Sequence, residues 1–341
     1  MRRWIIMQAI FACLAAVTAT GNVTQAAEPE PAYGPELQGF DYPWPVSYFS
    51  FPSQGETLRM AYMDVKPTAA ANGKVAVLFH GKNFCAATWR DTIGVLANAG
   101  YRVVAVDQIG FCKSSKPAHY QFTFQQLAAN TRALLASLSI NKSTIIGHST
   151  GGMLEMRYAL MYPDEIAQLV LVDPILKSDW IDKGVPWQSV DDWYQQDLKT
   201  TADSIREYER ATYYAHTWAP QYEIWVQMLA GMYRGSGREA VAWNSALLYD
   251  MIYTQPVFYE LDKISVPTLL LIGDKDTTAI SKNRAPLDVR ATLGNYPVLG
   301  KAAADRNAHI HLVEFPDLGH SPQIQAPDVF HKALLDGLRS P

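Results

Sequence analysis

The sequence is poor in charged residues, and its basic residues are not clustered. Charged side chains make up 18% of the 341 residues, and the formal net charge is −4. Proteins that bind nucleic acids or anionic membranes usually gather basic side chains on one surface. The composition therefore argues against both kinds of partner. Hydrophobic residues reach 48%, which is typical of a globular chain with a large buried core.

An apolar run of membrane-spanning length is also missing. Residues 4–17 are largely apolar and follow Arg2 and Arg3, but a transmembrane helix needs about 20 apolar residues. Basic residues, an apolar run and then small residues up to Ala26 form the order of a secretory signal peptide; an uncleaved anchor helix is the alternative. We expect residues 1–26 to be removed and the mature protein to be periplasmic or secreted, with no stable membrane insertion. Loss of two arginines would change its net charge to −6.

Cysteine is scarce. The chain has three, and Cys13 lies in the expected leader, so only Cys85 and Cys112 remain in the mature protein. An oxidising compartment permits a disulfide between them, provided that the fold brings them together.

The mature chain alternates between strand-like and helix-like segments. A hairpin is expected first, with strands at residues 46–51 and 58–65. The further expected strands are residues 75–79, 101–106, 143–146, 167–172, 266–272 and 309–315. The main helix-like segments are residues 86–99, 122–138, 151–161 and 327–338. Strands that alternate with helices of about 10–15 residues predict an α/β fold, with a mostly parallel sheet covered by helices on both faces.

The alternation stops between residues 175 and 265, where no strand-like run occurs. We interpret this segment as a helical cap, inserted between the two parts of one core, residues 27–174 and 266–341. Six of the nine tryptophans lie in it. We expect most of its large apolar side chains to pack the cap onto the sheet and the others to line an apolar substrate pocket. These side chains are Trp180, Trp187, Trp193, Trp218, Trp225, Trp243, Met228 and Met232.

One motif carries the strongest chemical signal. Gly147-His148-Ser149-Thr150-Gly151 lies directly between an expected strand and an expected helix. This is the G-x-S-x-G nucleophile elbow in the context that the motif requires, and it predicts Ser149 as a nucleophile. A glycine-rich turn with a structural serine is the alternative.

A serine nucleophile needs a base, and the base needs an orienting acid. In this architecture the acid and then the histidine follow the serine along the chain. Asp274 and Asp276 come after one expected strand, and His320 comes after the next. The other histidines are expected to be scaffold, packing or surface residues, with a metal role for the strand histidines His309 and His311 only a minor alternative. They are His80, His119, His148, His216, His309, His311 and His331.

From about residue 40 onward the chain resembles the α/β-hydrolase superfamily. The matching pieces are His80-Gly81, residues 107–117, the serine elbow, Gly273-Asp274-Lys275-Asp276 and Gly319-His320-Ser321-Pro322. The resemblance implies an eight-stranded, mostly parallel sheet with a helical cap. It also implies Asp276 as the acid, because the family usually uses the second aspartate of this motif. Asp274 is the second choice and Asp173, after the preceding strand, is the third.

The resemblance also implies an oxyanion hole and a cross-link. The oxyanion N–H groups would be those of Lys82 and Thr150, and the Lys82 side chain is expected to be solvated. His80 and Asp107 mark the ends of strands that are neighbours in the family's sheet. Since Cys85 and Cys112 each follow their marker by five residues, the resemblance predicts a disulfide between them, and two buried thiols are the alternative.

The serine also narrows the reaction. The spacing of residues 80–89 is similar to that of haloalkane dehalogenases, but those enzymes and the epoxide hydrolases of this fold use an aspartate where Ser149 stands. The sequence therefore predicts acyl transfer: a serine esterase for a small apolar ester, with no metal or organic cofactor implied. Alternatives with the same triad are a lactonase, an amidase, a carbon–carbon bond hydrolase and an acyltransferase. A ligand-binding protein without activity is a further alternative.

Overall fold

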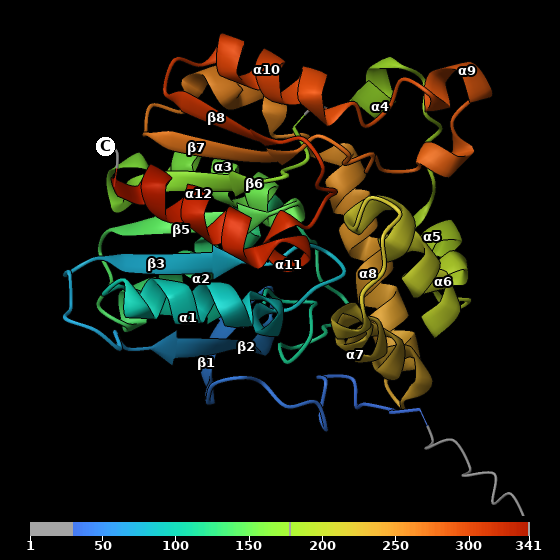
Figure 1. Cartoon of the computed structure of the whole chain (residues 1–341). Coiled ribbons are helices and arrows are strands. Elements are labelled where there is room, and N and C mark those ends of the chain that lie inside the picture. The colour runs from blue at the N-terminus through green and yellow to red at the C-terminus, as the bar shows by residue number, and fades with distance from the viewer. Residues whose placement is uncertain (1–29, 177–178, 340–341) are drawn as a thin grey trace, which may run out of the picture. The chain divides into compact units, whose positions relative to one another are not determined.

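A single mixed sheet organises the molecule. The computed structural model describes residues 30–176 and 179–339, so the expected signal peptide, residues 1–26, lies outside the described residues. The eight described strands form one sheet in the order β1-β2-β4-β3-β5-β6-β7-β8 (Figure 1). They are β1 (Val46–Ser53), β2 (Glu56–Val65), β3 (Val75–Phe79), β4 (Arg102–Val106), β5 (Ser143–His148), β6 (Ile166–Val172), β7 (Thr268–Gly273) and β8 (Ile310–Phe315).

The sheet is mostly parallel, which confirms the predicted fold class. β1, β2 and β4 pair antiparallel, and every pairing from β4 through β3 to β8 is parallel. The β1–β2 hairpin turns at Gln54 and Gly55, which both have positive φ, 51° and 83°. A two-residue turn with positive φ at both positions matches the right-handed twist of the strands.

Helices cover both faces of the sheet. α1 (Arg90–Asn98) and α12 (Pro327–Arg339) bury apolar side chains in the cluster on one face, whereas α2 (Phe124–Ser137) and α3 (Thr150–Met161) do so on the other. Along β3, Ala76 and Leu78 belong to the first cluster, and Val77 and Phe79 belong to the second. This alternation explains why β3 is apolar at every position, since a parallel sheet covered on both faces buries the side chains of its central strands.

The expected helix at residues 86–99 has two parts. It begins as a 3-10 turn, η1 (Ala86–Trp89), and continues as α1. The Thr88 N–H and hydroxyl both donate to the Cys85 carbonyl oxygen, at 3.0 and 2.6 Å. This i to i−3 pairing tightens the first turn, and apolar periodicity alone does not reveal it.

The insertion between β6 and β7 consists of helices and connecting loops, with no strand among its described residues. It comprises α4 (Asp179–Asp182), α5 (Val190–Asp197), α6 (Ala202–Tyr208), the π-helical turn η3 (Glu209–Tyr213), η4 (Pro220–Tyr222), α7 (Glu223–Arg234), α8 (Arg238–Thr254) and η5 (Phe258–Lys263). Figure 1 shows α5 to α8 at the side toward which β3 points. The described residues from Pro31 onward form one compact unit that includes this cap. No helix in the described part of the chain is both long and apolar enough to span a membrane.

Candidate active site

Ser149 lies on a strained turn at the carboxyl end of β5. Its backbone has φ 56° and ψ −116°, a conformation that is costly for a residue with a side chain and typical of functional sites. Space around the turn is minimal: a Cβ atom on Gly151 would lie 2.4 Å from the Phe79 carbonyl oxygen, and one on Gly147 would lie 2.5 Å from the Gly151 carbonyl oxygen. The glycines of the motif are therefore required for packing the elbow against β3.

His320 and Asp276 form a buried pair. His320 Nδ1 lies 2.5 Å from Asp276 Oδ2, and both side chains are fully buried. The second carboxylate oxygen of Asp276 accepts the Thr278 N–H at 2.7 Å. Because a carboxylate only accepts hydrogen bonds, Nδ1 carries the proton, and Nε2 of the neutral ring is left as an acceptor. No partner for Nε2 exists among the described residues, so the ring has the tautomer of a general base.

A second histidine, His148, connects the His320 loop to the serine elbow. His148, the residue before Ser149, donates from Nε2 to the His320 carbonyl oxygen at 2.7 Å, and the two rings lie 4.8 Å apart. Burial and, to a smaller degree, the neighbouring His320 hold the pKa of His148 well below its usual value. It is therefore a neutral scaffold residue, in agreement with the sequence prediction.

The cap also holds the histidine loop, which the sequence did not predict. The N–H groups of His320 and Ser321 donate to the carbonyl oxygens of Thr212 and Tyr213, at 3.2 and 3.1 Å. A Cβ atom on Gly319 would lie 2.7 Å from the Tyr213 carbonyl oxygen. Both carbonyls belong to the π-helical turn η3, so this turn of the cap positions the loop that carries His320.

The loop after β3 contacts Ser149. A Cβ atom on Gly81 would lie 3.2 Å from that of Ser149. His80 donates from Nδ1 to the Gly81 carbonyl oxygen at 2.8 Å and accepts the Gln108 N–H at Nε2, which fixes the loop. Thr150 is the first residue of α3, so its N–H has no partner within the helix. The backbone of the loop and the start of α3 thus meet at Ser149, as an oxyanion hole requires.

The Lys82 side chain is partly buried and hydrogen-bonded to the cap, whereas the sequence predicts a solvated side chain. Its Nζ donates to Ser245 Oγ at 2.7 Å and lies 3.4 Å from the centre of the Tyr249 ring. Burial lowers the pKa of Lys82 to about 8, and the charge of Asp197 counteracts this fall. The Lys82 ammonium group therefore binds cap residues, which replace part of its water.

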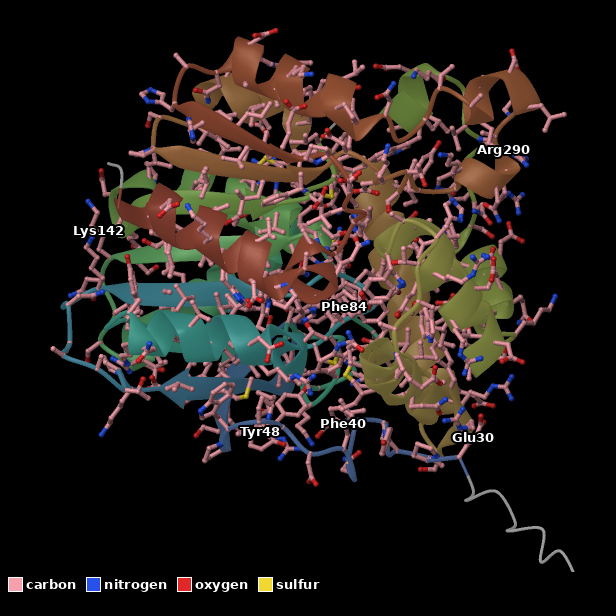
Figure 2. The ribbon with its side chains drawn as sticks, in the orientation of Figure 1. Glu30, Phe40, Tyr48, Phe84, Lys142 and Arg290 are labelled. Carbon is pink, nitrogen blue, oxygen red and sulfur yellow. A yellow bond between two sulfur atoms is a disulfide. The ribbon has the colours of Figure 1, made fainter. Side chains whose placement is uncertain are left out.

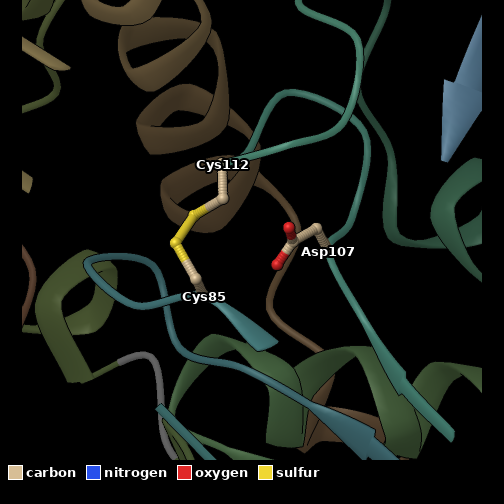
Figure 3. Close-up of side chains that lie close together, drawn as sticks. All are labelled: Cys85, Asp107 and Cys112. Atoms are coloured by element: carbon tan, nitrogen blue, oxygen red, sulfur yellow. A yellow bond between two sulfur atoms is a disulfide. The ribbon is translucent and has the colours of Figure 1, made fainter. Parts of the chain in front are cut away.

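Cys85 and Cys112 are joined by a disulfide, with a Cα–Cα distance of 5.9 Å (Figure 3). Asp107 lies beside it and binds the same two segments, because its carboxylate accepts the N–H groups of Ala86 and Lys113 at 2.7 and 3.1 Å. Cys85 follows Phe84, which Figure 2 shows near the junction of sheet and cap. The two sulfur atoms are bonded to each other, so Cys85 and Cys112 form a cross-link. The three residues are therefore not a set of metal ligands.

The two other candidate acids do not hydrogen-bond to His320. Asp274 is partly exposed. Asp173 is fully buried and accepts the Gly273 N–H at 2.8 Å, and one ligand atom each from Asp173, Asp276 and His320 lie within 4.8 Å of one another. Burial and, next, the charge of Asp276 raise the pKa of Asp173 well above its usual value. Burial therefore favours the protonated form of Asp173, which lies beside the His320–Asp276 pair.

The remaining histidines lie away from the pair. His119, His216, His309 and His311 are exposed, and His331 Nε2 lies 2.9 Å from Thr92 Oγ1 on α1.

Ser149 opens into a cavity of about 710 Å³ between the sheet loops and the cap. Its apolar wall includes Trp193, Ile205, Leu229, Ile252 and Ile280. Of the eight cap side chains singled out from the sequence, Trp193 alone lines it. Trp180, Trp225, Met228 and Met232 are buried elsewhere, and Trp187 is 58% exposed. The lining is also more polar than predicted, because lysine, arginine, threonine and serine side chains make up much of it.

A serine at a strand-to-helix turn, with an acid and a histidine on the loops after the next strands of a mostly parallel sheet, defines the α/β-hydrolase class. Residues 75–327 match the family model of the alpha/beta hydrolase fold, and the chain belongs to that family. It is therefore a hydrolase of the α/β-hydrolase family.

Three relatives are informative. A probable hydrolytic enzyme from Pseudomonas aeruginosa PAO1, whose crystal structure is known, is 64% identical, with a TM-score of 0.90 over 91% of this chain and 99% of that one. A 2-hydroxy-6-oxononadienedioate/2-hydroxy-6-oxononatrienedioate hydrolase from Comamonas testosteroni is 24% identical over 276 residues, which are 79% of this chain and 89% of the relative. The structure of an esterase from Exiguobacterium antarcticum, 19% identical, shares the fold with a TM-score of 0.64 over 83% of this chain and 96% of that one.

Proposed function

We propose that the protein hydrolyses carboxylic esters through an acyl-enzyme, with Ser149 as nucleophile, His320 as base and Asp276 as the orienting acid. One observation carries the proposal: Asp276 fixes the proton of His320 on Nδ1 and leaves Nε2 as a buried acceptor. A serine hydroxyl becomes a useful nucleophile only when such an acceptor takes its proton.

The proposed reaction has two halves. Ser149 Oγ attacks the ester carbonyl carbon and transfers its proton to His320 Nε2, while the N–H groups of Thr150 and Lys82 donate to the oxyanion. His320 then gives the proton to the leaving alcohol. Water attacks the acyl-enzyme in the same way, with His320 as base, and releases the acid. Each oxyanion donor typically stabilises such a transition state by about 3–4 kcal/mol.

A Ser149→Ala variant tests the proposal. On 4-nitrophenyl esters we expect its kcat to fall by at least about 10⁴-fold, because removal of a triad nucleophile usually leaves only residual catalysis. Ser47→Ala, an exposed serine on the edge strand β1, is the matched control and should keep the wild-type rate. A fluorophosphonate probe should label the wild type and not the Ser149 variant. Equal turnover by both variants would exclude Ser149 as the nucleophile.

The same triad also serves the hydrolysis of lactones, amides and carbon–carbon bonds, and acyl transfer to another acceptor. We put ester hydrolysis first because the sequence predicts it. Rates on matched ester, lactone, amide and diketone substrates, with product identification, separate these activities from one another.

We also propose that the protein is exported. The order of residues in 1–26 supports this, as does the disulfide, because disulfides persist in oxidising compartments. Cell fractionation should find the full chain outside the cytoplasm and a chain that starts after residue 26 inside it. Equal distribution of the two chains would contradict export through this segment.

A further inference from the structure

The cavity above Ser149 is basic, although the whole chain is acidic. Five charged side chains line it within the described chain, and four of them are basic. The basic residues are Lys82, Lys199, Lys282 and Arg290, and the acidic one is Asp197. A hydrolase for purely apolar esters has no use for such a lining, since charges beside a cavity are costly to desolvate.

The single acid is already engaged. Asp197 is buried, and burial raises its pKa, whereas the charge of Lys82 and a hydrogen bond from Ser245 counteract this rise. Ser245 also accepts from Lys82 Nζ at 2.7 Å. Asp197 thus balances Lys82, and the positive charges of Lys199, Lys282 and Arg290 remain.

Lys282 and Arg290 are held in fixed positions by backbone carbonyls. Lys282, in η6 (Lys282–Arg284), donates from Nζ to the carbonyl oxygens of Thr277 and Leu293, at 3.0 and 2.9 Å. Arg290, at the end of α9 (Leu287–Arg290), donates from Nη2 to those of Asn283 and Ala285 (Figure 2). Carbonyl oxygens satisfy donors but leave the positive charge uncancelled.

Lys282 and Arg290 each have N–H groups that bind no protein acceptor in the described structure. An ammonium has three N–H groups, of which Lys282 uses two. Both hydrogen bonds of Arg290 use Nη2, so the N–H groups of Nη1 have no partner in the described structure. Neither side chain forms an ion pair within residues 30–176 and 179–339. Two positioned cations in one cavity lining supply the positive charge and the N–H donors that a carboxylate requires.

Building on the proposed ester hydrolysis, we propose that the substrate carries a carboxylate remote from the scissile bond, and that Lys282 and Arg290 bind this carboxylate. The apolar wall formed by Trp193, Ile205 and Ile280 accommodates the chain between the two ends. The substrate class is therefore the half-ester of a dicarboxylic acid with an apolar middle. Lys199, exposed on the cap side of the same cavity, adds positive charge to the approach.

The kinetic test compares two esters that differ only in charge. Mono-4-nitrophenyl adipate ends in a carboxylate, and 4-nitrophenyl methyl adipate ends in a neutral ester. We expect wild-type kcat/KM to favour the anionic ester by at least about tenfold, equivalent to about 1.4 kcal/mol. In the double variant Lys282→Gln, Arg290→Gln this ratio should fall to near one, mainly through a higher KM for the anionic ester. Arg284→Gln removes an exposed arginine of the same segment that does not line the cavity, and it should keep the wild-type ratio.

Two results would overturn the proposal. One is a wild-type ratio near one. The other is an equal loss on both esters in the double variant, because that outcome means that the cations only brace the segment between β7 and α10 (Tyr296–Arg306). Arg290→Lys separates charge from bracing: it keeps the positive charge and loses the paired Nη2 bonds, so it should retain most of the preference for the anionic ester.

A binding measurement keeps this test independent of turnover. Calorimetry with Ser149→Ala protein should show monomethyl adipate binding at least about tenfold more tightly than dimethyl adipate, and the Lys282 and Arg290 substitutions should abolish the difference. Carboxylate-dependent binding without Ser149-dependent hydrolysis would refute the esterase proposal alone. Equal binding of the two ligands would refute the carboxylate site alone.

Discussion

Removal of the Cys85–Cys112 disulfide should destabilise the protein mainly through its unfolded state. The cross-link closes a loop with a sequence separation of 27, for which the chain-entropy relation gives about 3.6 kcal/mol at 25 °C. In the folded state the Asp107 carboxylate still holds Ala86 and Lys113, so the two segments should stay together without the sulfur bond. We therefore expect the double variant Cys85→Ala, Cys112→Ala to fold and to lose about 3–4 kcal/mol of unfolding free energy.

Urea unfolding followed by tryptophan fluorescence measures this loss. With a denaturant slope of about 3 kcal/mol/M, the midpoint should fall by about 1 M. Both single Cys→Ala variants should fall to the same midpoint, because either one opens the loop. Reductant with a thiol-blocking reagent under unfolding conditions should lower the wild-type midpoint to that of the double variant and leave the double variant unchanged.

The folded-state part of the reasoning has its own readout. Because the Asp107 bonds hold the loop at Lys82, kcat/KM of the double variant on a 4-nitrophenyl ester should stay within about threefold of wild type. A midpoint unchanged by the double substitution would refute the entropic estimate. A large loss of activity in the folded double variant would show that the disulfide, and not Asp107, positions the loop.

Three further substitutions test the buried acids. Glu209 is fully buried beside Tyr214, and burial raises its pKa to about 8. The folded-state pKa of Glu209 thus lies above its unfolded value, so the unfolding free energy of the wild type should fall as pH rises from about 4.5 to 8. In urea titrations the stability advantage of Glu209→Gln over the wild type should therefore grow by up to about 1.4 kcal/mol per pH unit. A constant difference would refute this, and exposed Glu207→Gln is the control. Asp276→Asn should lower kcat by about 10⁴-fold through loss of the tautomer, whereas Asp274→Asn should stay near wild type; the reverse order would exchange their roles. Asp173→Asn should retain kcat within about tenfold, because an amide resembles the neutral acid, and a loss as large as that of Asp276→Asn would show that Asp173 is ionised.

The sequence predicts the parts of the fold that local patterns determine. Each expected strand is present with ends shifted by at most two residues, because short β-branched runs between turn residues have few alternatives. Ser149, Asp276 and His320 follow from chain order and motif, and the structure brings the last two into contact. Local rules work here because the carboxyl ends of neighbouring parallel strands meet at one edge of the sheet.

What the sequence misses depends on distant contacts. The η3 turn binds the His320 loop across more than one hundred residues of chain, and nothing in residues 209–213 distinguishes that turn from an ordinary helix end. The same holds for Lys82, whose partners Ser245 and Tyr249 lie on α8. A lysine in a loop predicts solvent exposure, and only the packed cap provides the hydroxyl and the ring that replace water.

The contacts around His320 link the cap to the catalytic base. Asp276 orients the His320 ring. The backbone carbonyl oxygen of His320 accepts from His148, and its backbone N–H donates to Thr212 of the cap. Two of these three restraints come from the sheet loops, but the third moves with η3. Lifting this turn would break the two backbone hydrogen bonds to residues 320 and 321, at a net cost of about 1–3 kcal/mol, and would release the base from its position. Tight packing at Gly319 therefore links the position of His320 to that of η3.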